Sequence, residues 1–341
     1  MSNNTVDDAL AYGRTHVEIG ILATTICILI CLSVLGNLAV IVAIYKSHQL
    51  RDEISNRLTI NLAITDLVNG AVVMTSSLIS TVSDGWDMGS LYCDLICCVN
   101  YCLIIVSMLT LFFISLDRYQ AIIHPLLYTE IITSRRITMM ISYTWVQGLV
   151  FCVIPAMLHW VEYDYHEAIC AIQWHKERDQ AIFYVVAAFI LCFLMPGLAL
   201  GFCYCKILKE VKKKSQVHPS VYQNNQDGSI SKKKKYSTSS KAVRSLLIIV
   251  CAYFICMTPF SVTKLIKVSW ENKTFLRGSL NTAASVIAFC SSAINPLIYG
   301  IFRRDFRAAY KRLICKVKQG GNPSNITTAH ATEDDLDSSD H

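Results

Sequence analysis

Seven long apolar windows follow one another along the chain. Six of them contain no Asp, Glu, Lys or Arg, and the second contains a single charge, Asp66. The windows cover residues 19–45, 58–83, 95–116, 137–161, 180–205, 245–263 and 278–302. An α-helix of roughly 20 apolar residues crosses the hydrocarbon core of a bilayer. The pattern therefore predicts seven membrane-spanning helices.

Two other readings of the apolar windows fail. One such window could be a buried helix of a large soluble protein, but seven in succession could not all be buried in a chain of 341 residues. The strands of a membrane β-barrel alternate in polarity over about ten residues, whereas these windows are apolar throughout. The predicted fold class is an all-α membrane protein, a seven-transmembrane helix bundle.

Composition supports this class. Charged residues make up 16% of the chain and mean hydropathy is +0.41, against about 25% charged residues in soluble domains. We expect an extracellular tail at 1–18, a transmembrane domain at 19–302 with a flexible inner loop at 214–238, an amphipathic membrane-surface helix at 303–315, and a cytoplasmic tail at 316–341. The first window is too long for a cleaved signal peptide, so we expect it to act as an uncleaved signal anchor.

Basic residues predict the orientation, because inner segments of membrane proteins are enriched in Lys and Arg. With the N-terminus outside, Lys and Arg gather at 46–51, 135–136, 206–214, 232–235 and 303–312, whereas the outer segments are acidic. The plasma membrane is the expected location. This inner surface explains the net charge of +6, so we expect no binding to nucleic acid.

Asp66 is the clearest functional candidate within the windows. A charge in hydrocarbon is costly, so an ionisable residue at mid-membrane is a functional hypothesis by default. Most of the 15 cysteines fall inside apolar windows, where Cys behaves as a small hydrophobe. Only Cys93 and Cys170 lie at or beyond an outer boundary, where the environment is oxidising. Asn3 opens the sequon Asn3-Asn4-Thr5 in the outer tail and is a candidate glycosylation site.

Short motifs occur in order on successive predicted helices. They are Gly36-Asn37, Leu62-Ala63-x-x-Asp66, Asp117-Arg118-Tyr119, Trp145, Pro196 with Tyr204, Cys256-x-x-Pro259, and Asn295-Pro296-x-x-Tyr299. Together they resemble the signature of the rhodopsin-like (class A) G-protein-coupled receptors, near the amine and opsin branch. The resemblance implies a receptor that activates heterotrimeric G proteins by guanine-nucleotide exchange and performs no bond chemistry of its own. A transporter is the distant alternative, and the absence of internal repeats counts against it.

The resemblance implies two further features of the bundle. Cys93 and Cys170 match the family's outer disulfide, which would hold the second outer loop over the bundle mouth. The positions that match the family's allosteric sodium site are Asp66, Ser107, Ser292 and Asn295. Their oxygens suit a hard cation, and a hydrogen-bonded network filled with water is the alternative. No other cofactor is expected.

The inner motifs imply the switching machinery. In the family, the Arg of the third-helix motif pairs with its neighbouring Asp at rest and meets the G protein when active. The matching residues are Asp117, Arg118, Tyr119, Tyr204, Asn295, Pro296 and Tyr299. Many members add an acid on the sixth helix that locks this Arg, but residues 239–241 here read Ser-Ser-Lys. We therefore predict that the lock is missing and that basal activity is appreciable.

The resemblance also implies a ligand pocket near the outer side. Its aligned positions are Asn100, Tyr101, Ile104, Ala188, Cys192, Met257, Phe260, Ser261, Lys264, Asn281, Ser285 and Phe289. Aminergic receptors carry an Asp where Asn100 stands, so a monoamine bound in the usual way is not expected. Opsins need a Lys in the seventh helix, and 278–302 contains none.

The ligand stays unknown, an orphan-like case, with an amine receptor of non-standard site as the alternative. Lys264 and Lys267 either meet an acidic ligand or snorkel, and we favour snorkelling.

Residues after Tyr299 alternate apolar and basic side chains at helical spacing. This pattern predicts a short helix on the inner leaflet, with Cys315 as a candidate palmitoylation site or a free thiol. Expected partners are a heterotrimeric G protein, arrestin and receptor kinases, membrane lipid, and an extracellular ligand.

Overall fold

The computed structural model describes residues 13–173, 178–217, 229–269 and 278–319. At some helix ends, including 229–245 and 314–319, it describes the backbone path alone. Asn3 lies outside the described residues, as do the tail 1–12 and residues 320–341.

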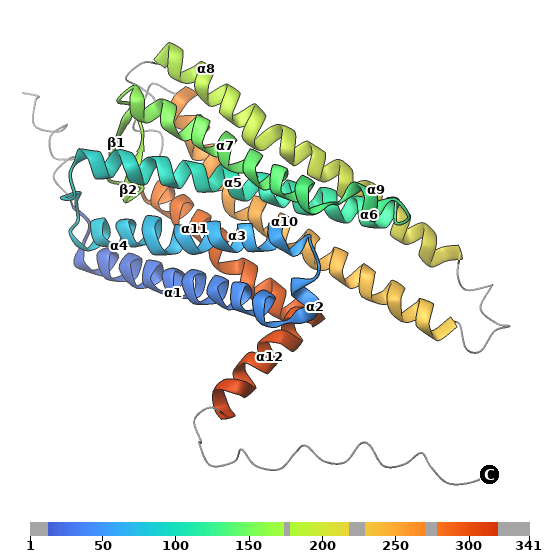
Figure 1. The fold of residues 1–341 in the computed structure, drawn as a ribbon. Helices are drawn as coiled ribbons and strands as arrows, with labels where there is room; N and C mark the ends of the chain where they lie inside the picture. Colours follow the sequence, from blue (N-terminus) through green and yellow to red (C-terminus); the bar gives the residue numbers. More distant parts are fainter. Residues whose placement is uncertain (1–12, 174–177, 218–228, 270–277, 320–341) are drawn as a thin grey trace, which may run out of the picture.

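Seven membrane-length helices form the bundle, and they run side by side along one axis (Figure 1). In chain order they are α1 (His16–Lys46); α3 (Asn56–Val68), η1 (Asn69–Met74) and α4 (Thr75–Val82) as one span; α5 (Ser90–Ile123); α7 (Ser134–Met157); α8 (Arg178–Phe189), η2 (Ile190–Leu194) and α9 (Met195–Val217) as one span; α10 (Ser229–Ser269); and α11 (Gly278–Phe302). Short helices α2 (His48–Arg51) and α6 (Tyr128–Ile131) lie at the end of the bundle that is predicted to face inward and is called the inner end below, and α12 (Arg304–Gln319) leaves the bundle at an angle (Figure 1). The predicted bundle and eighth helix are confirmed.

The first helix begins earlier than its apolar window. Thr15 and Glu18 form a capping box, in which each side chain bonds the backbone N–H of the other residue. Such a box satisfies two of the donors that a helix start leaves without partners. Residues 16–18, expected in the tail, therefore belong to α1.

The predicted inner loop is shorter than expected. Helix α9 continues to Val217 and α10 begins at Ser229, so only 218–228 of the expected stretch 214–238 lies outside the described residues. Lys is a good helix former once a preceding turn exists, which explains why the lysine-rich flanks extend both helices. Helix α12 likewise runs beyond residue 315 to Gln319.

Four prolines lie within the described spans. Pro155, Pro259 and Pro296 lie inside helices, where each removes a backbone donor. Pro196 lies two residues after the π-helical segment η2, and its missing N–H would otherwise bond the carbonyl of Cys192. The π-helical turn η2 accommodates that loss with a wider winding of the backbone.

A two-stranded hairpin crosses the outer end of the bundle. Strands β1 (Val161–Asp164) and β2 (Ile169–Ile172) pair antiparallel, with Tyr163 opposite Cys170. All four residues of β2 are buried. The sequence did not predict this hairpin.

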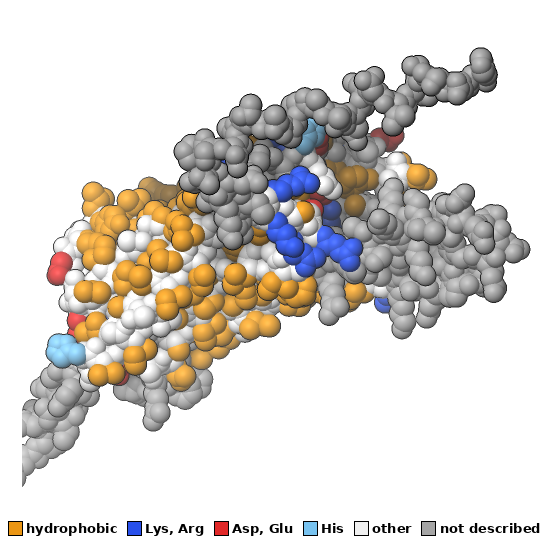
Figure 2. Space-filling model, turned by 90° about the horizontal axis from the view of Figure 1, so that it is seen from below, with side chains coloured by type: hydrophobic (Ala, Val, Ile, Leu, Met, Phe, Trp, Pro, Cys, Tyr) orange, Lys and Arg blue, Asp and Glu red, His pale blue; other side chains and the backbone are white. Residues whose placement is uncertain are grey.

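Apolar side chains cover the outside of the bundle as well as its centre. Figure 2 shows hydrophobic side chains spread over the described surface on one face, with a group of Lys and Arg side chains near its middle. Exposed apolar residues such as Leu35, Val146 and Leu198 are 60–67% exposed. A surface of this kind fits contact with lipid tails.

Candidate functional site

A small cavity lies below the hairpin, between α5, α10 and α11. Its volume, counted as the space open to the centre of a water molecule, is about 30 Å³. The cavity therefore holds little more than one water molecule in this structure. Its lining residues are Asn69, Asn100, Ile104, Ile169, Met257, Phe260, Ser285, Ala288, Phe289 and Ser291. The lining carries no charged side chain.

Six of the predicted pocket residues line this cavity together, and six lie elsewhere. The six that line it are Asn100, Ile104, Met257, Phe260, Ser285 and Phe289. Those outside its lining are Tyr101, Ala188, Cys192, Ser261, Lys264 and Asn281. The ligand role of all of them stays a prediction.

Cys192 shows why alignment by spacing fails in the fifth span. It lies in η2 and packs against Ile105, Leu109 and Phe151, and the amide of Gln147 donates to its Sγ at 3.4 Å. A π-helical turn contains more residues than an α-helical turn. Residues in and after it therefore face a different direction from the one that regular α-helical spacing predicts. Cys192 therefore faces α5 and α7 and not the cavity.

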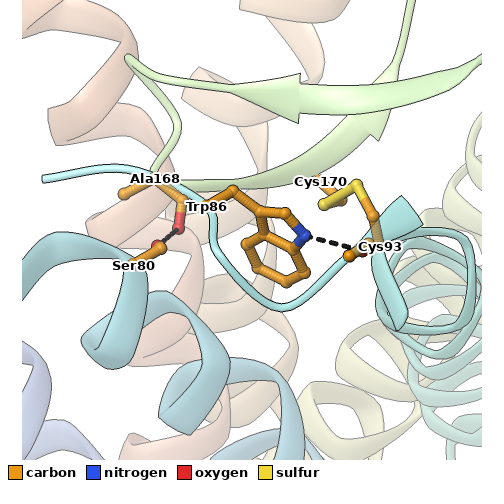
Figure 3. The surroundings of a disulfide bond; sticks show 6 residues. Ser80, Trp86, Cys93, Ala168 and Cys170 are labelled. Carbon is orange, nitrogen blue, oxygen red and sulfur yellow. Dashed lines mark hydrogen bonds between the residues drawn. A yellow bond between two sulfur atoms is a disulfide. The ribbon is translucent and has the colours of Figure 1, made fainter. Parts of the chain in front are cut away.

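A disulfide fixes the hairpin above the cavity. Cys93, at the start of α5, bonds Cys170 in β2, as the resemblance implied. Figure 3 shows Trp86 beside this bridge, with its Nε1 donating to the carbonyl of Gly89, and Ser80 donating to the carbonyl of Ala168. Ile169, which follows Ala168, lines the cavity. The hairpin is thus the upper wall of the cavity.

Two lysines of α10 bind the hairpin from the other side. The ammonium of Lys264 pairs with both carboxylate oxygens of Glu167, and Lys267 donates to Asp164 at 2.6 Å and to Glu167 at 2.5 Å. The side chains of Lys264 and Glu167 are 8% and 1% exposed. The expectation that these lysines snorkel is wrong, because the hairpin brings carboxylates close enough to pair with them.

Neighbouring charges keep the Asp164 carboxylate of the hairpin ionised. Burial raises the pKa of Asp164, but the charges of Lys267 and Lys264 and the hydrogen bond from Lys267 outweigh it, and the pKa lies below its usual value.

A buried polar network surrounds Asp66 in the middle of the bundle. Asn295 donates to its Oδ2 at 2.8 Å, and the Ser292 side chain also bonds its carboxylate. Asn69 donates to Ser292 Oγ at 2.9 Å. Ser107 instead donates to Thr65 Oγ1 at 3.2 Å. The structure thus brings Asp66, Ser292 and Asn295 into direct contact and turns the Ser107 hydroxyl toward α3.

The donor set is suited to a hard cation in part. Asp66 and Ser292 supply oxygens, whereas Asn295 presents its amide nitrogen to the carboxylate and the Ser107 hydroxyl is turned toward Thr65. Further sequence-remote bonds close the network: Asn37 donates to the carbonyl of Ser292 at 3.0 Å, and Ser33 to that of Asp66 at 2.8 Å.

Charged residues meet at the inner end of α5. Arg118 Nε donates to Asp117 Oδ2 at 2.7 Å, and the side chain of Asp117 is 1% exposed. Tyr128, from α6, donates to Asp117 Oδ1 at 2.8 Å. Burial and the adjacent Asp117 carboxylate raise the pKa of Tyr128 to about 12, so it stays a donor at neutral pH.

Arg118 has a second acidic partner. Its Nη2 donates to Glu53 Oε1 at 2.9 Å and to Ser55 Oγ at 2.5 Å. Both partners lie in the turn between α2 and α3. The expectation that the sixth helix supplies no lock for Arg118 stays a prediction; in the described part of the chain, Asp117 and Glu53 of this turn are acids that contact Arg118. Ser239, Ser240 and Lys241 lie where the backbone alone is described.

The other predicted switching residues lie around this inner end. Ser115 donates to Tyr204 OH at 3.3 Å, so α5 and α9 meet one turn above Arg118. Tyr299 is 2% exposed and stacks on Phe306 of α12, with ring centroids 5.1 Å apart. Pro296 packs against Gly36, where an added Cβ would lie 2.9 Å from the proline ring. Tyr119 contacts His124 edge to face.

Seven helices of membrane length around a buried polar core define a multi-pass membrane protein of receptor architecture. Residues 36–299 match the family described as "7 transmembrane receptor (rhodopsin family)". The chain therefore belongs to the rhodopsin family of seven-transmembrane receptors.

Individual relatives agree with the family. The chain is 28% identical to G-protein coupled receptor 161 of Mus musculus, over 90% of this chain and 58% of that protein. It is 27% identical to the 5-hydroxytryptamine receptor 4 of Cavia porcellus and 26% identical to the human histamine H2 receptor, over 89% and 92% of this chain and 81% and 85% of those receptors. The chain spans about three fifths of the length of the first curated relatives it matches.

The fold has a solved counterpart. The crystal structure of squid rhodopsin superposes with a TM-score of 0.80 at 21% identity, covering 90% of this chain and 88% of that one. At this identity the likeness concerns the fold alone.

Proposed function

We propose that this protein is a ligand-activated receptor of the plasma membrane, with its N-terminus outside, that catalyses guanine-nucleotide exchange on a heterotrimeric G protein. The observation that carries the proposal is the Arg118 side chain, held at the inner end of α5 by Asp117 and 21% exposed. An Arg at that place is ready to leave its carboxylates for a partner from the inner side. The relatives named above, which are described as receptors, support the proposal.

The ligand that fits the cavity best is a small molecule without a positive charge. Asn100 and Ser285 supply neutral hydrogen-bonding groups, and the remaining walls are mainly apolar. A desolvated ammonium would need a carboxylate there, and none of the lining residues carries one, while the buried Glu167, two residues before the lining residue Ile169, is paired with Lys264. The cavity has to widen for such a ligand, and the hairpin residue Ile169 is the wall nearest the outside.

Arrestin, receptor kinases and inner-leaflet lipid are further proposed partners. The amphipathic helix α12 exposes Arg304, Arg307 and Lys311 while burying Phe306, which suits anionic lipid headgroups. Cys315 lies in α12, where its side chain is outside the described part, and palmitoylation there stays a proposal. A sodium ion at Asp66 is proposed as an allosteric inhibitor.

Expression of the full chain in cells tests the function. Cyclic AMP, calcium and arrestin recruitment are recorded at matched surface levels for the wild type, Arg118→Ala and Arg135→Ala. Arg135 is an exposed basic residue at the inner end of α7 and serves as the matched loss of charge. We expect one pathway to respond to receptor expression in the wild type and Arg135→Ala and to lose that response in Arg118→Ala. A response equal in all three would contradict the proposed role of Arg118.

A further inference from the structure

The turn between α2 and α3 brings a carboxylate to the inner end of α5. Glu53 lies 65 positions before Arg118 in the sequence, yet its Oε1 accepts from Arg118 Nη2 at 2.9 Å. Ser55, from the same turn, accepts from Arg118 at 2.5 Å. Two residues of one turn therefore bind Arg118 Nη2, which also lies 2.5 Å from Asp117 Oδ2.

The turn is itself firmly positioned. Asn56 is 3% exposed and donates to the carbonyl of Leu50 at 2.7 Å, closing the turn from the α3 side. The same amide donates to Glu53 Oε2 at 3.3 Å, and Ser55 donates to Glu53 Oε1 at 3.2 Å. Leu50 is 1% exposed and belongs to the main apolar core. The Glu53 carboxylate is thus aimed by buried anchors rather than by chance on a loose loop.

Glu53 also reaches the start of α12. Arg303 Nη2 lies 3.8 Å from Glu53 Oε2, and Arg303 pairs with Asp305 at 2.5 Å. The guanidinium of Arg303 lies 4.5 Å above the ring of Phe306, which stacks on Tyr299. Glu53 therefore connects the α5 arginine with the junction of α11 and α12.

The two acids that hold Arg118 differ in how they can let go. Asp117 is its sequence neighbour on the same helix, is 1% exposed, and receives a second bond from Tyr128, so it moves with Arg118. Glu53 is 36% exposed and lies on a different element. Any displacement of the inner end of α5 from the α2–α3 turn separates Glu53 from Arg118 and leaves Asp117 in place.

The charge state of Glu53 suits a lock at neutral pH. Burial raises its pKa, but the Arg118 and Arg303 guanidinium groups outweigh that effect, and the pKa lies below its usual 4.5. Both members of the pair are ionised in the cell.

We propose that Glu53, from the turn between α2 and α3, supplies the lock that holds Arg118 in the resting receptor, and that this turn sets the basal activity. In this proposal the acid that locks Arg118 comes from the turn between α2 and α3. Because Glu53 also contacts Arg303, the lock is sensitive to the position of α12. The inference rests on the proposed function for its signalling readout, but the lock itself is a property of the receptor alone.

The test uses Glu53→Gln in the full chain, in lipid nanodiscs and in cells. Gln keeps the size of Glu53 and one acceptor oxygen, and removes its charge. Asp52→Asn is the matched control, because Asp52 is the neighbouring acid of the same turn and pairs with His48 instead. Hydrogen–deuterium exchange is measured at residues 50–58 and at the described inner part of α10, 246–252, and basal signalling is measured at matched surface levels.

We expect Glu53→Gln to raise exchange at both segments and to raise the ratio of unlocked to locked receptor about fivefold, the size typical of a partly exposed ion pair. Asp52→Asn should leave both readouts at wild-type level. Glu53→Asp, which shortens the reach by one methylene, should fall between them.

In an Arg118→Ala background Glu53→Gln should have no further effect on exchange. Equal exchange in Glu53→Gln and wild type, or the same rise in Asp52→Asn, would overturn the lock. Raised exchange without any signal in cells would leave the lock standing and contradict the proposed coupling.

Discussion

Asp66 illustrates how a single buried charge organises its surroundings. Its carboxylate is 3% exposed and receives Asn295 and Ser292, as expected where water is excluded and polar groups must find partners. The chain sequence predicted these partners from their matching positions. It did not predict that the Ser107 hydroxyl turns toward Thr65, since rotamers depend on packing that no motif encodes.

Replacement of Asp66 tests the sodium proposal. The purified receptor should unfold at a higher temperature in sodium chloride than in potassium chloride, because an ion that binds only the folded state stabilises that state. At a sodium concentration about ten times the dissociation constant, the unfolding temperature should rise by about 2–4 °C. Asp66→Asn should abolish this difference. Asp94→Asn, which removes an acid at the outer mouth, should keep it. A sodium effect that survives in Asp66→Asn would refute the site.

The Lys264–Glu167 pair gives a second prediction at this scale. Lys264→Met leaves the Glu167 carboxylate, 1% exposed, with Lys267 alone, and breaking a buried pair costs about 3–5 kcal/mol. We expect a clearly lower unfolding temperature. The double change Lys264→Met with Glu167→Gln should recover part of the loss, since no unpaired charge stays buried. If the double variant lost more stability than the two single variants lose when their losses are added, the contact would not be ionic.

At the scale of elements, helices were predictable and their connections were not. The apolar windows locate all seven spans because length and polarity alone decide which segments cross a membrane. Strands β1 and β2 escaped notice because four residues carry too little alternation to be recognised. Glu53 was missed for a related reason: its partner lies 65 positions away, and only the folded α2–α3 turn joins them.

The outer disulfide gives the prediction for the hairpin. Cys93 and Cys170 are 77 positions apart, and a bridge closing a loop of that length stabilises by about 4 kcal/mol in the chain-entropy description. The double change Cys93→Ser with Cys170→Ser should lower the unfolding temperature and raise hydrogen exchange in 161–172. Cys97→Ser, a buried thiol nearby that is free, is the control. An unchanged hairpin exchange in the double variant would mean that Lys264 and Lys267 hold it without the bridge.

The whole molecule carries ionic clamps at both ends of an apolar bundle. The outer clamp joins Lys264 and Lys267 to the hairpin, and the inner clamp joins Arg118 to Glu53. The polar network around Asp66 lies between them. Movement of α10 relative to α5 would alter the outer clamp, because the hairpin is bonded to α5 through Cys93, whereas movement of α5 relative to the α2–α3 turn would alter the inner lock.

The pH dependence of stability follows from the clamps. The pKa values of Glu53 and Asp164 both lie below their usual 4.5 and 3.8. For a depressed carboxyl pKa, the stabilisation is fully present above the usual value and is lost as pH falls through the lower, folded value. These groups should therefore change the unfolding temperature in nanodiscs little between pH 5 and 7. Below about pH 4.5 the unfolding temperature should fall. Glu53→Gln should show a smaller acid-dependent fall, and an identical fall would contradict the assignment.

The most direct measurement of the central claim is the rate of GDP release from purified heterotrimers, one for each class of Gα subunit, mixed with the receptor in nanodiscs. We predict that at least one class releases GDP faster with the wild-type receptor, still faster with Glu53→Gln, and at its intrinsic rate with Arg118→Ala. Release at the intrinsic rate from every class, with Glu53→Gln as with the wild type, would contradict the account of this protein as a G-protein-activating receptor.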